Sequence, residues 1–335
     1  MSNPRISIVM AAKNVEPYIK ECLDSIIEQS FDNWELIAVD DHSNDRTAEI
    51  IKEYQAKDTR IHYFLSEGKK LNPALITAQK HIKGELLNRM DADDIMPSYK
   101  LAVLLEAWEK KGKGHVVAGG TKHFVETGEV GEGFLRYDAW LNEVARKGSH
   151  YREIYRECVI PSHCWLIHKD DFFNVGGFED IYPEDYDLCF KFYQAQFKIV
   201  PLDKVLHYWR DRTDRISRTW EEYKDNRYFE LKLKYFFKID RDLERPLVVW
   251  GAGRNGKDLI KLIHKQESSP RWVCNNEKKI GKDIYGIKLE SENSALDIEN
   301  PQILVVVSNP SERSEIKKQL TDLHFIEGKH FWFFL

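Results

Sequence analysis

The sequence predicts an α/β protein of two domains, the larger built on a mixed, mainly parallel sheet with helices on both faces. Short apolar runs alternate with amphipathic stretches from Ile6 to Met90, and this alternation is typical of parallel sheets. A second alternation starts after Pro246 and predicts a smaller α/β domain. The chain has 335 residues, longer than one average domain, and 42% of them are hydrophobic, which suffices for two packed cores.

The strands and helices of the larger domain follow one another in order. Apolar runs predict strands at residues 6–10, 34–39, 61–65 and 85–90. Helices are predicted at residues 17–26, 45–55 and 73–82. Pro17 opens the first turn of the first helix, and Asp45 or Thr47 caps the second. The carboxyl ends of these strands should therefore meet at one edge of the sheet.

The rest of the chain divides into three stretches. Residues 100–235 combine helices, short strands and loops around a Gly176-Gly177 turn. We place the first domain at residues 1–220, a helical linker at 221–244 and the second domain at 245–335. Within the second domain, strands are predicted at 247–250, 272–273 and 303–307, and helices at 259–263 and 314–323.

Charge balance and cysteine content exclude several classes of protein. The net charge is −5, so no overall basic field would attract nucleic acid. Five scattered cysteines without a CxxC pair argue against a disulfide framework and a zinc site, and fit a reducing compartment. No stretch approaches the roughly 20 apolar residues that span a bilayer, and we expect no cleaved leader. We therefore expect a cytoplasmic protein, soluble or peripheral at the inner face of the membrane.

Two acidic clusters come directly after predicted strands. Asp40-Asp41 follows one strand, and Asp91-Ala-Asp-Asp94 follows another. Because parallel α/β sheets bind ligands at the carboxyl ends of their strands, both clusters lie where a ligand is expected. Carboxylates at alternate positions, as in Asp91 and Asp93, can converge on a hard divalent cation. For an isolated motif of this length, a solvated acidic loop or a helix N-terminus is the simpler interpretation.

The order of several motifs resembles family 2 glycosyltransferases of the GT-A fold. The matching segments are Ile6-Ser-Ile-Val-Met-Ala-Ala-Lys-Asn14, Val39-Asp-Asp-His-Ser43, Asp91-Ala-Asp-Asp94, Val175-Gly-Gly-Phe178 and Glu184-Asp-Tyr-Asp-Leu188. The resemblance covers roughly residues 5–220. It implies an inverting enzyme with a nucleotide-sugar donor, a Mn²⁺ or Mg²⁺ cofactor, and an acceptor held by the middle of the chain.

The resemblance also implies roles for residues at the strand ends. Ala11 and Asn14 would form the floor of the nucleotide pocket. Asp41 would accept a hydrogen bond from the base, which favours a UDP-sugar. Asp91 would be shared between ribose and metal, and Asp93 would contact the metal directly. Asp40 would stabilise the loop through backbone hydrogen bonds, and Asp94 would support the site from behind.

Asp185 matches the position of the family's catalytic base. Inverting transfer needs a base within hydrogen-bond reach of the acceptor hydroxyl, on the face of the sugar opposite the leaving group. The simpler interpretation is that Glu184 and Asp185 cap a helix beginning at Tyr186. Both roles are compatible, because a carboxylate at a helix start can be rigidly aimed.

Two further residues match less specific parts of the family pattern. His163 lies in a segment where the family often carries a histidine, which could contact the diphosphate or the metal or be purely structural. Arg210 lies in a segment that resembles the family's donor-closing loop, where a cation can clamp the diphosphate; Arg215 and Ser217 belong to the same segment. A solvated basic loop is the simpler interpretation for Arg212 and Arg218.

Two features depart from the family pattern. Many members carry an Arg-Asn pair in the helix before the acidic strand, which residues 72–77 lack, so Lys69, Lys70 or Asn72 would have to substitute. The segment between Asp94 and Pro97 is also one residue shorter than usual. The resemblance therefore does not identify the donor sugar.

A glycine-rich turn, Gly251-Ala-Gly253-Arg-Asn-Gly256, follows the first strand of the second domain. In this context the GxGxxG motif predicts a Rossmann-like domain that places a diphosphate at a helix N-terminus. The acid expected about 20 residues later is replaced by Asn275 or Asn276, which could make a weaker contact. A glycine-tightened turn in a domain used for assembly is an equal alternative.

The sequence therefore leaves two functions open. The first is transfer of a sugar to a hydroxyl of a glycan or lipid-linked acceptor, which the resemblance places in bacterial surface polysaccharide synthesis. The second is a nucleotide-binding regulatory protein or oxidoreductase whose first domain binds carbohydrate without catalysis. The joint presence of Asp91, Asp93 and Asp185 favours the first.

Two aromatic segments have alternative interpretations. Residues 227–238 mix bases with aromatics and predict a packing helix, with a membrane contact as the alternative. Residues 331–335 predict a buried terminal strand, with a contact in a homo-oligomer as the alternative.

Overall fold

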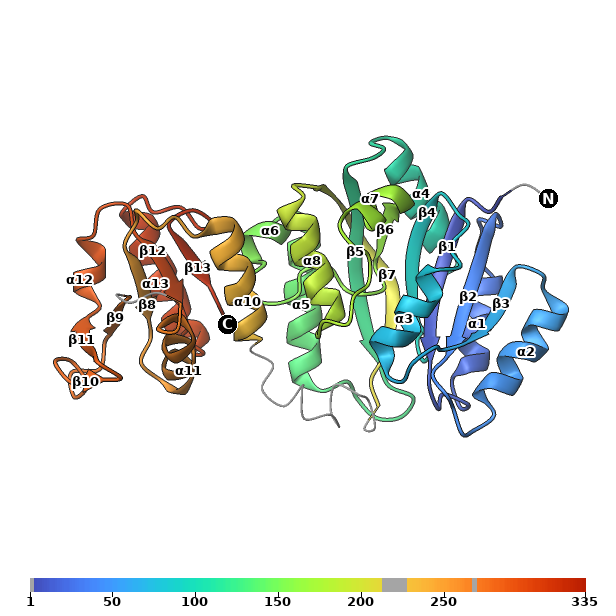
Figure 1. Cartoon of the computed structure of the whole chain (residues 1–335), viewed down its shortest axis with the longest axis horizontal. Coiled ribbons are helices and arrows are strands. Elements are labelled where there is room, and N and C mark those ends of the chain that lie inside the picture. The colour runs from blue at the N-terminus through green and yellow to red at the C-terminus, as the bar shows by residue number, and fades with distance from the viewer. Residues whose placement is uncertain (1–2, 213–227, 267–269) are drawn as a thin grey trace. The chain divides into compact units, whose positions relative to one another are not determined.

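The computed structural model describes residues 3–212, 228–266 and 270–335, which form two compact units. The first unit comprises Met1–His150 and Val159–Trp220, and the second comprises Tyr151–Cys158 and Glu221–Leu335. Each unit is built on its own sheet (Figure 1). The short segment Tyr151–Cys158 thus belongs with the C-terminal residues, although we placed it in the first domain.

The sheet of the first unit has seven strands in the order β3-β2-β1-β4-β6-β5-β7. Strands β1 to β4 are parallel, and β6 runs antiparallel to both β4 and β5. The mixed, mainly parallel sheet expected from the sequence is therefore confirmed. The strands are β1 Ile6–Ala12, β2 Trp34–Asp40, β3 Ile61–Leu65, β4 Leu86–Asp91, β5 His115–Phe124, β6 Trp165–His168 and β7 Lys198–Arg210.

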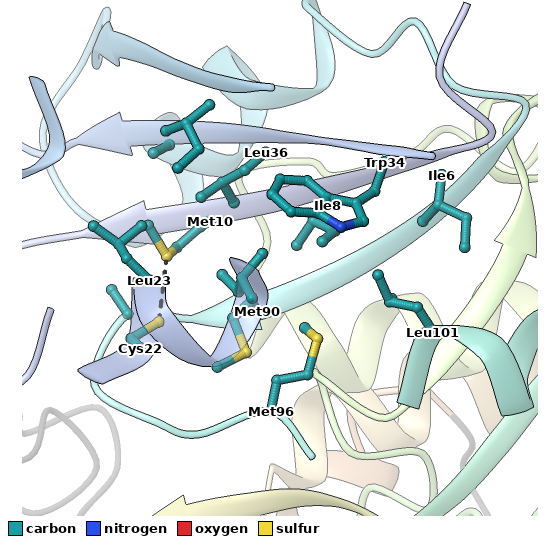
Figure 2. Close-up of a cluster of buried hydrophobic side chains, with 14 of the residues drawn as sticks. Ile6, Ile8, Met10, Cys22, Leu23, Trp34, Leu36, Met90, Met96 and Leu101 are labelled. Carbon is teal, nitrogen blue, oxygen red and sulfur yellow. Dashed lines mark hydrogen bonds between the residues drawn. The ribbon is translucent and has the colours of Figure 1, made fainter. Parts of the chain in front are cut away.

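Helices of the first unit cover both faces of this sheet. Side chains of α1, α2 and α4 share one core with the inward residues of β1, whereas α3 contacts β1 and β2 outside that core. The alternation of β1 puts Ile6, Ile8 and Met10 on the core side, where Met10 meets Cys22 and Leu23 of α1 (Figure 2). The helices are α1 Ile19–Ile27, α2 Thr47–Lys57, α3 Leu71–Gln79, α4 Lys100–Glu109, α5 Glu132–Lys147, α7 Lys169–Asn174 and α8 Glu184–Gln194.

The sheet of the second unit has six strands in the order β10-β11-β9-β8-β12-β13. All neighbours are parallel except the β10–β11 hairpin. The strands are β8 Leu247–Trp250, β9 Arg271–Cys274, β10 Asp283–Ile284, β11 Ile287–Ser291, β12 Gln302–Val305 and β13 Phe331–Phe333. The helices are α10 Phe229–Tyr235, the π-helix η2 Phe236–Asp240, α11 Arg254–Ile263, α12 Asn293–Leu296 and α13 Pro310–Asp322, and α6 His150–Glu153 starts at the border of this unit.

The two aromatic segments pack inside the second unit. Leu233 and Tyr235 of α10 are buried, and the buried Lys232 donates hydrogen bonds from Nζ to the carbonyl oxygens of Arg156 and Phe334 at 3.0 and 3.1 Å. The terminal strand β13 pairs with β12 and is buried, so a packing helix and a buried strand are confirmed.

Within the described ranges, no helix is both long enough and apolar enough to cross a bilayer.

Candidate active site

The acidic clusters meet at one edge of the first sheet. The parallel register places Ala11 of β1 opposite Val39 of β2 and opposite Asp91 of β4. The turns that follow these three strands therefore lie side by side at their carboxyl ends. This edge is where the sequence predicted a nucleotide.

Asn14 joins the turn after β1 to the turn after β2. Its backbone N–H donates to Ser43 Oγ at 2.9 Å, and its side-chain oxygen accepts from the backbone N–H of Asn44 at 2.9 Å. Asp40 accepts from the backbone N–H of Ser43 at 3.2 Å, so its expected role in stabilising the loop is confirmed. These bonds fix the walls of the expected nucleotide pocket.

Asp41 is buried behind this pocket and already has cationic and backbone partners. It pairs with Lys13 Nζ at 2.8 Å and accepts from the backbone N–H of Lys70 at 2.9 Å. Lys70 has a positive φ of 86°, so Asp41 holds an unusual backbone conformation at the start of α3. A contact between Asp41 and a base stays a prediction.

A buried arginine connects the two carboxylate motifs. Arg89 donates from Nε to Asp91 Oδ1 at 3.1 Å and from a terminal nitrogen to Glu184 Oε1 at 2.7 Å. Burial opposes the charge of Arg89, but Asp91 and Glu184 outweigh it and raise the pKa of the guanidinium. Sequence reasoning missed Arg89, because its partner Glu184 lies 95 residues away in the chain and no motif indicates the contact.

Asp185 lies in the first turn of α8, next to Glu184, and is partly buried. Burial and the negative charge of Glu184 together raise the pKa of Asp185 to about 7, against the opposing effect of Arg89. Glu184 Oε2 is buried and has no hydrogen-bond partner among the described residues. A carboxyl group that titrates near neutral pH is suited to proton transfer.

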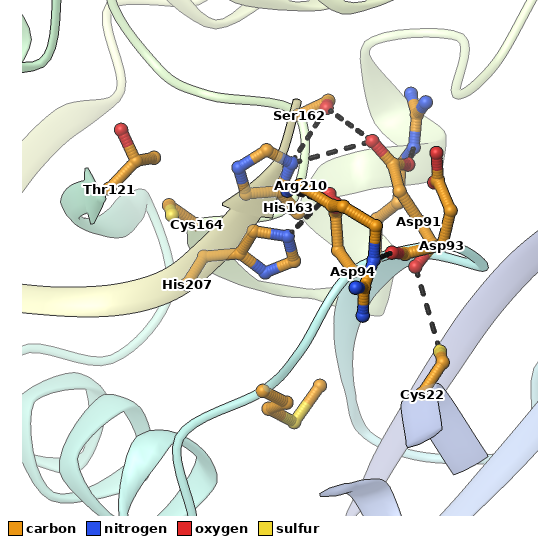
Figure 3. Close-up of polar contacts among 12 residues, drawn as sticks. Cys22, Asp91, Asp93, Asp94, Thr121, Ser162, His163, Cys164, His207 and Arg210 are labelled. Atoms are coloured by element: carbon orange, nitrogen blue, oxygen red, sulfur yellow. Dashed lines mark hydrogen bonds and ion pairs between the residues drawn. The ribbon is translucent and has the colours of Figure 1, made fainter. Parts of the chain in front are cut away.

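His163 lies beside Asp91, and its predicted contact with the diphosphate or the metal stays a prediction. Its Nδ1 lies 3.4 Å from Asp91 Oδ2 and 3.3 Å from Ser162 Oγ (Figure 3). Burial lowers the pKa of His163 to about 4, so the ring is neutral at pH 7. The buried Lys100 donates from Nζ to the carbonyl oxygen of His163 at 2.7 Å and holds this turn in place.

Asp94 lies against β7, and two residues of that strand donate hydrogen bonds to it. It accepts from His207 Nε2 at 2.8 Å and from the backbone N–H of Arg210 at 2.7 Å, which agrees with a supporting role. Asp94, His163 and His207 also offer three ligand atoms within 4.8 Å of one another. The rings of His163 and His207 are stacked, however, with centroids 3.5 Å apart and planes 20° apart (Figure 3). Because an imidazole binds metal in its ring plane, one ring must turn before both can meet one ion.

Asp93 is paired with an arginine that we expected to be solvated. Arg212 donates from Nε to Asp93 Oδ2 at 2.9 Å, and its side chain is only 15% exposed. The solvated interpretation is therefore wrong for Arg212. The contact spans 119 residues, so no local pattern in the sequence predicts it. The described residues do not include Arg215, Ser217 and Arg218 of the same predicted segment.

Arg210 is buried rather than open to solvent. It donates from Nε to the carbonyl oxygen of Asp93 at 2.7 Å and pairs with Glu126 and Glu21. The Arg210 guanidinium thus braces the acidic turn after β4. Its predicted role as a clamp for the diphosphate would require the two glutamate contacts to open.

Two other predicted residues have different surroundings. Lys69 is exposed in the turn before α3, whereas Asn72 is buried and donates from Nδ2 to the carbonyl oxygen of Ile181 at 3.1 Å. Gln79 of α3 accepts from the backbone N–H of Phe178 at 2.9 Å. Helix α3 therefore positions the loop before α8 through Asn72 and Gln79, while Lys69 remains available to a ligand.

The family is decided by the match to a family model. The model described as Glycosyl transferase family 2 matches residues 7–175, about half of the chain. The chain belongs to glycosyl transferase family 2. The matched range contains all of the strand-end acids and His163, and the predicted resemblance and GT-A fold are confirmed.

Relatives and solved structures agree with this family. Glycosyltransferase GlyA of Streptococcus pneumoniae is 27% identical over 65% of this chain, which spans 32% of GlyA. The structure of S. aureus TarS residues 1–349 with UDP-GlcNAc is 17% identical, covering 95% of this chain and 80% of its own, at a TM-score of 0.53. The structure of mannosyltransferase PcManGT from Pyrobaculum calidifontis with GDP-Man and Mn²⁺ is 19% identical. The match covers 71% of this chain and 64% of PcManGT, at a TM-score of 0.53. At these identities, the structures show the fold of this family 2 chain.

Proposed function

We propose that this family 2 chain is an inverting glycosyltransferase that moves a sugar from a UDP-sugar to a hydroxyl of a glycan or lipid-linked acceptor. The observation that carries the proposal is Asp185, whose pKa is raised to about 7, beside Glu184 and the Arg89 link to Asp91. The nucleotide sugars in the TarS and PcManGT structures, UDP-GlcNAc and GDP-Man, support a nucleotide-sugar donor. Bacterial surface polysaccharide synthesis, at the inner face of the membrane, is the proposed setting.

In the proposed reaction, Asp185 accepts the proton of the acceptor hydroxyl. The acceptor oxygen forms a bond to the anomeric carbon while the bond from that carbon to the diphosphate oxygen breaks. The electron pair of the broken bond leaves with the nucleoside diphosphate. Attack from the face opposite the leaving group inverts the anomeric configuration. Burial and the neighbouring Glu184 raise the pKa of this base to about 7, against the effect of Arg89, which also donates to Glu184.

A divalent cation, Mn²⁺ or Mg²⁺, would neutralise the charge that develops on the leaving diphosphate. Asp93 would hold it, with Asp91 shared between the cation and the ribose. Carboxylate oxygens fit a hard cation, and both side chains remain partly accessible, at 18% and 25% exposure. The pairing of Asp93 with Arg212 would have to open for the cation to bind.

A donor screen followed by a transfer assay tests this function. We expect a nucleotide sugar to raise the melting temperature of the chain when Mn²⁺ is present, because a ligand that binds only the folded state stabilises it. Asp185→Asn should then lower turnover by about 10²–10⁴-fold while leaving this shift in place. Asp203→Asn removes an exposed carboxylate of the same unit and serves as the matched control. Full turnover in Asp185→Asn would refute the mechanism, and donor binding that ignores Mn²⁺ would refute the role of Asp93.

A further inference from the structure

The second unit contains a cavity of about 310 Å³ at the carboxyl ends of β8, β9 and β12. Its walls are the turns that follow these strands, residues 250–255, 274–276 and 306–309, together with Lys279 and Glu312. Strand β8 lies between β9 and β12, so the chain continues from β8 to one side and later returns on the other. Open parallel sheets bind ligands at such a reversal of strand order.

The three glycines of the GxGxxG motif have different roles in this cavity. Gly251 has a φ of +126°, and a Cβ there would lie 3.0 Å from the carbonyl oxygen of Val306. Gly256 packs against Gly251 so closely that its Cβ would lie 1.8 Å from the Gly251 oxygen. At Gly253, by contrast, a Cβ would meet no atom within 4 Å. The first and third glycines are thus required by packing, whereas Gly253 leaves open space beside the cavity.

The groups around Gly253 suit an anion. Gly253 is the N-cap of α11, and the first backbone N–H groups of a helix have no partner within the helix. Arg254 and Lys279 line the same cavity, and Lys279 Nζ donates to the carbonyl oxygen of Ala252 at 2.7 Å. This bond fixes a positive charge beside the turn. A phosphate or diphosphate is the matching ligand group.

A carboxylate enters the cavity from a helix that the motif does not include. Asn275 occupies the place after β9 where an acid was expected, and its Nδ2 donates to Glu312 Oε1 of α13 at 3.0 Å. Asn309 caps α13 by accepting from the backbone N–H groups of Ser311 and Glu312, which fixes the turn that carries this carboxylate. Glu312 thus supplies from α13 the acid that typical ribose sites place at the end of the second strand.

We propose that this cavity is a second ligand site, which binds a nucleoside diphosphate independently of the donor site. The diphosphate would lie at the Gly253 turn, and the ribose hydroxyls would bond to Glu312 and Asn275. A volume of about 310 Å³ is at the lower end of the range of about 300–1,000 Å³ for small-ligand sites, which favours one nucleotide over a dinucleotide. The site would let a nucleotide act on the chain without occupying the transfer centre.

Calorimetric titration of the full chain with UDP, GDP and ADP tests the proposal. Gly253→Val places a side chain in the open space, and its φ of −75° suits any residue, so the fold should survive. Glu312→Gln removes the proposed ribose contact, and Glu315→Gln, on the exposed side of α13, is the matched control. Asp93→Asn reports separately on the donor site.

We expect at least one of the three nucleotides to bind wild type with an affinity that falls tenfold or more in Gly253→Val. Glu312→Gln should weaken the same binding severalfold, whereas Glu315→Gln and Asp93→Asn should leave it unchanged. Hydrogen exchange should slow at residues 253–257 when that nucleotide is added. The proposal is overturned if no nucleotide distinguishes wild type from Gly253→Val, or if binding is lost only in Asp93→Asn. If Gly253→Val does not fold, the comparison of Glu312→Gln with Glu315→Gln decides between these results.

Discussion

Both units gather polar groups at the carboxyl ends of parallel strands, but the two edges present different groups to a ligand. In the first unit, Asp41, Asp91 and Asp93 follow the strands, and each is paired with a cationic side chain. In the second unit, the turn after β8 presents glycines and the start of a helix, and Arg254 and Lys279 line the cavity. The same topology therefore supports two different kinds of site.

The difference teaches what each edge needs in order to hold a diphosphate. Carboxylates repel phosphate, so the edge of the first unit requires an intervening cation, which is also what stabilises a leaving group during transfer. Backbone N–H groups and basic side chains attract phosphate directly, so the edge of the second unit can bind without a metal. Chemistry is expected at the first edge and simple binding at the second.

The largest expected effect is the loss of the proposed base, Asp185, which should affect the first edge alone. Asp185→Asn should lower the rate of transfer by about 10²–10⁴-fold, the usual contribution of a general base. Nucleotide binding by the second unit should not change. Steady-state kinetics and calorimetry on one preparation measure both quantities, with Asp203→Asn as control. Equal losses in the two quantities would mean that the edges are not independent.

The next largest effect concerns the ion pairs of one arginine in each unit. Arg89→Gln leaves Asp91 and Glu184 without their buried cation and should lower the free energy of unfolding of the first unit by about 3 kcal/mol. In the second unit, Arg271→Gln removes a half-exposed pair with Glu290 and should cost less than about 1 kcal/mol. Urea unfolding measures both variants. A similar cost in the two variants would refute the structural importance of the Arg89 link.

The pH dependence of transfer should reveal the pairing of Glu184 with Asp185. Asp185 acts as a base only when it is deprotonated, and its pKa is raised to about 7, so kcat/KM should fall as pH decreases through about 7. Glu184→Gln removes the neighbouring negative charge, which should lower the pKa of Asp185 and move the midpoint to lower pH. Rates measured from about pH 5 to 9 test this. An unchanged midpoint would show that Glu184 does not tune the base.

The smallest expected effect distinguishes metal from arginine at the first edge. Arg212→Gln frees the carboxylate of Asp93 and should tighten Mn²⁺ binding about two- to fivefold, because a pair of this kind contributes up to about 1 kcal/mol. Mn²⁺ titration followed by electron paramagnetic resonance measures the affinity. The exposed Arg146→Gln is the matched control. Weaker binding in Arg212→Gln would show that the arginine supports the metal instead of competing with it.

Local patterns were sufficient to predict the strands and the acids at their ends. The apolar runs before Asp41 and Asp91 predict buried strands, and parallel pairing then brings their ends together without further information. The same reasoning places Gly251 and Gly256 in a tight turn after β8. A packing helix was also predicted within residues 227–238, and the structure has α10 at Phe229–Tyr235.

The partners of these residues could not be predicted, because they come from distant parts of the chain. Arg89 meets Glu184 across 95 residues, and Arg212 meets Asp93 across 119. The raised pKa of Asp185 also depends on packing, because burial is its largest cause and the charges of Glu184 and Arg89 act on it in opposite directions.

The sequence by itself determined the class of fold, the order of the strands and helices up to residue 90, and the edge where each unit gathers polar groups. These features depend on periodicity and turn chemistry, which are local. Only the tertiary structure decided which side chains meet: Arg89 contacts both Asp91 and Glu184, and Asn275 donates to Glu312. Electrostatic interactions depend on distance and burial, and both are determined only when the elements pack.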